Sequence, residues 1–150
     1  MRLPFTPRRL GHDGGSAAIE FALFAPFLTA TLIAVIEIGL AIHGSIRTQA
    51  AADIGAAWAV GHGYSAAGIS SAILSGSDAS GLTVSPAPVL ACGCPTATGV
   101  TAAACGTNCS NGVAARQYVT VSASLLRTSI FASGLPLPTT LTRQTVARLP

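Results

Sequence analysis

The sequence predicts an α+β protein: one long N-terminal transmembrane helix continues into a small domain that contains a short second helix and an antiparallel sheet. An apolar stretch covers residues 21–42 and carries a single charge, Glu37. Apolar residues at helical spacing follow over residues 46–58. Residues 117–125 then alternate between apolar and polar side chains, which is typical of a half-buried strand.

The composition restricts the classes of function. Of the 150 residues, 9% are charged, against about 25% in ordinary soluble domains. The net charge of +3 is too small for a nucleic-acid-binding surface, and a hydrophobic content of 50% is too high for a disordered chain. Membrane proteins and polymer subunits have this kind of composition, because both replace water with another apolar surface.

The apolar stretch is long enough to cross a membrane. At about 1.5 Å per residue, a helix over residues 21–42 spans roughly 33 Å, close to the thickness of the hydrocarbon core. Three arginines (Arg2, Arg8 and Arg9) and one acid (Asp13) precede it. The positive-inside rule then places residues 1–15 in the cytoplasm, the transmembrane helix at residues 16–44, and residues 45–150 in the periplasm. The alternative is a removed signal peptide, but its apolar region is shorter, about 7–15 residues, and ends at a small-residue cleavage site.

The helix is expected to continue to about residue 60, where Gly61 and Gly63 follow as stop signals. We expect its core-facing stripe to consist of the apolar residues at helical spacing, with Arg47, Thr48 and Asp53 off the stripe. These apolar residues are Ile46, Ala50, Ile54, Ala57 and Trp58.

The remaining elements are shorter. Residues 65–76 predict the second helix, with Ser65 as its N-cap. Strands are expected at residues 82–85, 117–125 and 139–147. Because Pro136 and Pro138 separate the last two, these strands should pair across a loop rather than a tight turn.

Four cysteines, Cys92, Cys94, Cys105 and Cys109, lie in a Gly/Thr/Ala-rich segment that we expect to be a loop over residues 92–109. On the oxidising periplasmic side, two disulfides are the default. A Cys92–Cys94 bond would close a very small ring, so pairs between the two clusters are favoured. The alternative is a zinc site of four thiolates, against which the oxidising compartment argues. No metal or other cofactor is therefore predicted.

No catalytic constellation is apparent. His12, His43 and His62 are isolated from one another in the sequence, and no serine stands in a nucleophile-elbow motif. We expect neither an enzyme nor a protein with a small-molecule substrate.

A glycine, Gly15, precedes Glu20 by five residues at the start of the apolar helix. This spacing resembles the processing site of type IV prepilins and pseudopilins. The resemblance implies that a membrane-embedded peptidase cuts between Gly15 and Ser16, with Glu20 and Phe21 completing the recognised sequence. It also implies that Glu20 pairs with the new N-terminal amine of a neighbouring subunit. The alternative for Glu20 is a solvated place in the polar interface of the membrane.

Residues 18–26, Ala-Ile-Glu-Phe-Ala-Leu-Phe-Ala-Pro, resemble the opening of TadE-like proteins, minor pseudopilins of the tight-adherence (Flp-type) pilus system. Residues 49–57 resemble the family's Ala-rich continuation, although Asp53 and Ala57 replace its arginines. The resemblance implies a pilin-like fold and a place in the bacterial inner membrane or in the extracellular pilus. The implied partners are a prepilin peptidase, other pilin or pseudopilin subunits and the Flp-type secretion machinery.

Subunit assembly is assigned to Glu20, to Pro26, which should kink the helix, and to Glu37. For Glu37, a place in the membrane interface is the open alternative. The rival function is a single-pass, membrane-anchored binding module whose working part is the cysteine loop, held by disulfides or by zinc.

Overall fold

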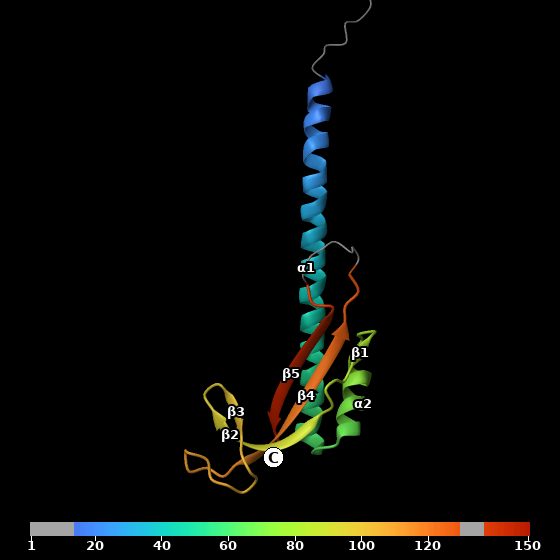
Figure 1. Cartoon of the computed structure of the whole chain (residues 1–150). Helices are drawn as coiled ribbons and strands as arrows, with labels where there is room; N and C mark the ends of the chain where they lie inside the picture. The colour runs from blue at the N-terminus through green and yellow to red at the C-terminus, as the bar shows by residue number, and fades with distance from the viewer. Residues whose placement is uncertain (1–13, 130–136) are drawn as a thin grey trace, which may run out of the picture. The chain divides into compact units, whose positions relative to one another are not determined.

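The computed structural model describes residues 14–129 and 137–150. The chain forms two compact units, Met1–Glu37 and Ile38–Pro150. Figure 1 labels the elements, which are α1 (Gly14–His62), α2 (Ala66–Gly76), β1 (Leu82–Thr83), β2 (Val89–Thr96), β3 (Gly99–Ala102), β4 (Arg116–Leu126) and β5 (Thr140–Arg148). The predicted fold class is confirmed: a long apolar helix, a short second helix and an antiparallel sheet.

Helix α1 is the longest element, with 49 residues, and extends two residues beyond the predicted helix at each end. Pro26 lies inside it. Within the described residues, α1 is the one helix long and apolar enough to cross a membrane, and its most apolar window has no buried residue. The first unit therefore consists, in its described part, of a helix that presents apolar side chains all round.

The face of α1 that packs in the second unit differs from most of the predicted stripe. The prediction was wrong for Ile46, Ala50 and Ala57, which are exposed, whereas Ile54 and Trp58 are half-buried. Ile46 is 64% exposed, whereas Thr48, expected off the stripe, is fully buried. The buried face consists mainly of small residues: Gly44, Thr48, Ala51, Ala52, Gly55, Ala56 and Ala59.

This face of α1 is buried because the helix lies very close to α2 and β4. A Cβ atom added at Gly55 would lie 2.7 Å from the Ile73 side chain and 2.9 Å from that of Val121. Only small side chains fit at such a distance, because protein interiors are already close-packed. The Thr48 hydroxyl is accommodated by donating a 2.7 Å hydrogen bond to the carbonyl oxygen of Gly44, one turn earlier.

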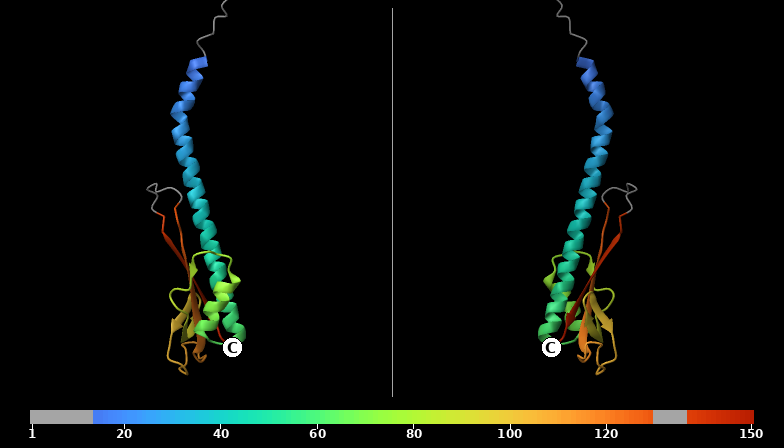
Figure 2. Two further views of the ribbon diagram at one scale, coloured as in Figure 1. Left: turned by 90° about the vertical axis from the view of Figure 1, so that its right-hand side faces the viewer. Right: turned by 90° about the vertical axis from the view of Figure 1, so that its left-hand side faces the viewer.

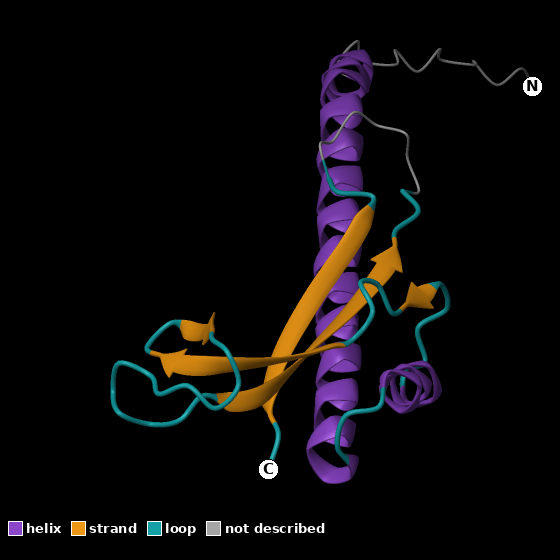
Figure 3. Cartoon of the chain, turned by 60° about the horizontal axis from the view of Figure 1, so that its bottom comes forward, coloured by secondary structure: helices purple, strands orange, loops and turns teal. Residues whose placement is uncertain are grey.

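Strand β4 is the centre of the sheet, and all its neighbours are antiparallel (Figure 3). On one edge it pairs with β5 from Tyr118↔Arg148 to Leu126↔Thr140. On its other edge it pairs first with β2 and then with β1. The predicted pairing of the two C-terminal strands is confirmed. Pro136, which lies between them in the sequence, is outside the described residues. The expected loop over residues 92–109, however, contains most of β2 and all of β3, which pair as a hairpin.

The core lies between the sheet and the two helices, which Figure 2 shows on the same side of the sheet. Ile69 and Ile73 of α2 and Val119 and Val121 of β4 are fully buried, and the other buried residues of this core cluster are largely alanines. The predicted N-cap of α2 is confirmed, since Ser65 Oγ accepts the backbone N–H of Gly68 at 3.2 Å. Trp58, the chain's only tryptophan, packs against this core.

We predict that Gly55→Ala destabilises the domain by about 1–3 kcal/mol, because the added methyl group overpacks the contact with Ile73 and Val121. Gly61→Ala is the matched control, since a Cβ there meets nothing within 4 Å. It should be neutral or stabilising by up to about 1 kcal/mol through helix propensity. Thermal unfolding of the full chain, followed by Trp58 fluorescence, measures both. Equal melting temperatures for the two variants would contradict the close contact.

Candidate processing and assembly site

The predicted cleavage site lies in the first turn of α1. The helix begins at Gly14, so both Gly15 and Ser16 have helical backbone conformations. Ser16 Oγ donates a hydrogen bond to Glu20 Oε1 at 3.1 Å, and both side chains are exposed. The structure thus brings together Ser16 and Glu20, the two polar residues of the predicted site, across one helical turn.

The glycine pair makes this turn easy to open. Each glycine inside a helix costs about 1 kcal/mol relative to alanine, and a helix end lacks the hydrogen bonds that hold an interior turn. Gly14 and Gly15 can therefore adopt the extended backbone that a protease cleft requires. If the Gly15–Ser16 bond is hydrolysed, the ammonium group of Ser16 stands one turn before the carboxylate of Glu20. The arrangement then holds one positive and one negative group at the entrance of an apolar helix.

The helix surface that follows is apolar in every direction. Phe21 is 68% exposed, and six further large side chains are at least 55% exposed: Leu23, Phe24, Phe27, Leu28, Leu32 and Val35. An apolar surface of this extent is typical of a helix in lipid or against other helices. Pro26 lacks the N–H that would bond the carbonyl of Ala22, and this carbonyl is therefore open to a donor from outside the helix.

Glu37 is in a different environment from Glu20. Its side chain is 1% exposed, whereas that of Glu20 is exposed. The two carboxylates also stand 17 positions apart in the sequence, about 260° around the helix at 100° per residue. They do not form a pair, and the assembly role of Glu37 stays a prediction.

The four cysteines form two disulfides, Cys92–Cys105 and Cys94–Cys109, with Cα–Cα distances of 5.2 and 5.6 Å. Both bonds join the two clusters, as favoured from the sequence. Thiolates engaged in disulfides cannot ligate zinc, so the structure supports the disulfide alternative. Among residues 14–129 and 137–150, no group of three or more His, Cys, Asp or Glu side chains is placed to hold a metal ion.

Polar side-chain contacts between α1 and β5 were not predicted. Asp53 Oδ1 accepts hydrogen bonds from Gln49 Nε2 at 3.1 Å and from Thr145 Oγ1 at 2.6 Å. Arg143 donates to Ser45 Oγ through Nε at 2.8 Å and also through Nη2. The alternation of residues in the last strand was the available signal, because it places Arg143 and Thr145 on the same face as the buried Leu141.

Comparison with known proteins matches only the N-terminal part of the chain. A family model described as TadE-like protein matches residues 15–57. The match covers all the predicted processing and assembly residues from Gly15 to Glu37 and contains none of the sheet. No curated protein and no solved structure matches the chain.

The disulfide connectivity predicts which thiol each single substitution exposes. Cys92→Ser should leave Cys105 free, and Cys94→Ser should leave Cys109 free. Alkylation without reductant, followed by reduction, a second label and peptide sequencing, identifies the free thiol. Each loss should also lower the stability of the domain by about 2–4 kcal/mol. Labelling of Cys109 in the Cys92→Ser protein would establish the other cross-cluster pairing.

Proposed function

We propose that this protein, which is TadE-like over residues 15–57, is a minor pseudopilin of a Flp-type (tight-adherence) pilus system, processed after Gly15. One observation carries the proposal: the family match begins at Gly15, at the start of a continuous apolar helix. The family indicates a protein associated with Tad pili and a structural rather than enzymatic role. In this proposal the chain is a substrate of a peptidase and a subunit, not a catalyst.

The proposed location is the bacterial inner membrane, in a single-pass orientation. The arginines of residues 1–15 would hold the N-terminus in the cytoplasm, and residues 45–150 would lie in the periplasm. The two disulfides support this orientation, because they persist in an oxidising compartment. After assembly, the domain would belong to the membrane-bound complex or to the extracellular fibre.

In the proposed processing step, a prepilin peptidase hydrolyses the Gly15–Ser16 bond. Water supplies the hydroxyl that leaves with the Gly15 carboxylate, and the Ser16 nitrogen becomes an ammonium group. The chain contributes a first turn that unwinds at low cost, while Phe21 and the following apolar residues hold the bond at the membrane surface. The peptidase contributes the catalytic groups.

In the proposed assembly step, Glu20 pairs with the Ser16 ammonium group of a neighbouring subunit. A carboxylate entering an apolar environment is unfavourable unless it is paired, so this ion pair would favour helix packing only between processed subunits. Pro26 would contribute a further contact to pilin or pseudopilin subunits or to the secretion machinery, whereas Glu37, assigned to assembly from the sequence, is buried within the chain and makes no such contact in this conformation. Pro26 does so through the open carbonyl of Ala22.

We predict that co-expression with the matching peptidase removes residues 1–15. Intact-mass measurement and N-terminal sequencing of the membrane form should give Ser16 as the first residue. Gly15→Val should block cleavage, because a β-branched residue hinders entry into a narrow cleft. Gly39→Ala is the control, because a Cβ there meets nothing within 4 Å and the position lies outside the first turn of α1; this variant should be cleaved normally. Recovery of Met1 or Arg2 at the N-terminus of the wild-type protein, with active peptidase present, would contradict the proposal.

We also predict that Glu20→Ala impairs assembly more than membrane insertion. Removing one partner of a buried ion pair costs about 3–5 kcal/mol, so pilus formation should fall by at least about tenfold. The amount of protein in the membrane fraction should stay unchanged. Asp78→Asn is the control, since Asp78 is an exposed acid outside α1. Normal piliation of the Glu20→Ala strain would exclude the pairing role.

A further inference from the structure

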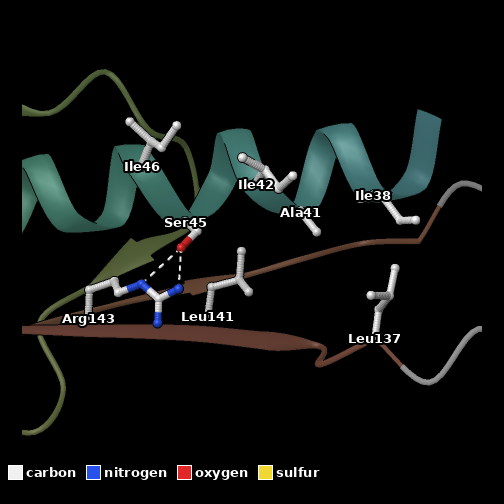
Figure 4. Close-up of a pocket in the computed structure, with 8 residues that line it drawn as sticks. All are labelled: Ile38, Ala41, Ile42, Ser45, Ile46, Leu137, Leu141 and Arg143. Carbon is white, nitrogen blue, oxygen red and sulfur yellow. Dashed lines mark hydrogen bonds between the residues drawn. The ribbon is translucent and has the colours of Figure 1, made fainter. Parts of the chain in front are cut away.

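A hollow of about 290 Å³ lies in the second unit between α1 and the start of β5. Figure 4 shows Ile38, Ala41 and Ile42 on its helix side, with Leu137 and Leu141 opposite them. These five side chains are hydrocarbon. Ile38 and Ile42 remain 45% and 56% exposed, so the side chains of the described residues leave this apolar surface open.

One end of the hollow is polar. There Arg143 donates to Ser45 Oγ through Nε at 2.8 Å and also through Nη2 (Figure 4). A guanidinium group has five N–H donors, so three remain for another acceptor. Arg143 is exposed, so these donors can be reached from outside the domain. A fixed positive charge therefore stands at the end of an apolar hollow.

The apolar and polar ends of the hollow correspond to the hydrocarbon and headgroup regions of a membrane. Ile38 and Ile42 are the last isoleucines of the apolar stretch over residues 21–42, and Ser45 follows just beyond it. From Ile38 to Ser45 the helix rises about 10 Å. The apolar end is thus continuous with the helix surface expected in hydrocarbon. If residues 21–42 span the hydrocarbon, the polar end stands at the height of the lipid headgroups.

We propose that this hollow binds one phospholipid of the surrounding bilayer. An acyl chain lies against Ile38, Ile42 and Leu137, and the phosphate accepts hydrogen bonds from Arg143. Charge and size both favour this occupant. Arginine is suited to two-point binding of phosphate oxygens. A volume of about 290 Å³ holds roughly ten groups of the size of a water molecule, which suits part of an acyl chain. A helix about 10 Å wide is too large for it. The proposal rests on the membrane location of α1 and is independent of cleavage after Gly15.

The test is the amount of phospholipid that the full chain retains after purification in mild detergent, measured by mass spectrometry of the intact complex. The wild-type protein should retain one phospholipid per chain. Arg143→Gln should reduce this occupancy by about tenfold, and Arg143→Lys, which keeps the charge but loses the two-point geometry, should give an intermediate value. Arg148→Gln is the matched control, because Arg148 is an exposed arginine on the same strand that does not line the hollow. Equal occupancy in the wild-type and Arg143→Gln proteins would overturn the proposal.

A second variant tests the hollow without touching Arg143. Ala41→Leu adds three carbon atoms at its helix side, keeps helix propensity, and should displace the lipid as strongly as Arg143→Gln does. Unchanged Trp58 fluorescence would show that the domain remains folded in each variant. Cross-linking through Ile42→Cys examines the competing occupant, a second copy of the chain. Cross-linked dimers that carry no phospholipid would overturn the proposal. If the Ala41→Leu variant loses its phospholipid but is still cleaved after Gly15, the lipid-binding proposal is supported independently of the proposed function.

Discussion

The close contact between the small-residue face of α1 and strand β4 is the constraint on which the rest of the domain depends. Gly55 allows this contact, since any side chain there would collide with Ile73 and Val121. The consequence is a thin core in which alanines occupy positions that larger residues fill in most domains. Because the burial of an alanine contributes less than that of a leucine or phenylalanine, the domain needs further stabilisation. The two disulfides provide covalent links where the core does not reach.

The same helix carries two different surfaces along its length. Before Glu37, the large apolar side chains of the helix are mostly exposed, and after residue 43 the buried face is small and closely packed. This division explains the composition. The hydrophobic content is high, yet the aromatic content is 5%, because much of it is alanine used for close approach. Few charges are needed on a helix that is apolar at one end and packs against a sheet at the other. The charged residues of α1 accordingly have specific surroundings, as Asp53 does with Thr145.

The sequence was sufficient for elements with a strong periodic pattern and insufficient for those made by tertiary contacts. The alternation around Val119 and Val121 predicted β4, and Ser65 predicted the start of α2. Strand β2 was missed because Gly93 and Pro95 are poor strand formers, whereas pairing with β4 and cross-linking through two cysteines determine its structure. Most of the predicted core-facing stripe of α1 was wrong because the prediction placed large apolar residues in the core. The short distance between α1 and its neighbours, which a single sequence does not reveal, leaves room in the core only for small residues such as Ala52. At the candidate site, the neighbouring positions of Ser16 and Glu20 on one helix followed from their spacing alone, but the position of Arg143 required the register of β5.

The central place of β4 also sets an order of events during export. If the chain crosses the membrane after its N-terminal anchor, residues 82–109 reach the far side before β4 does. The β2–β3 hairpin and both disulfides lie within that portion and can form there. Neither β1 nor β2 has its main partner until residues 116–126 have emerged, and β5 adds last. The cross-linked β2–β3 hairpin would then already be formed when β4 emerges and pairs with β2. The domain would close only after β4 and β5 have emerged, so the sheet would be completed later than the cross-linked hairpin.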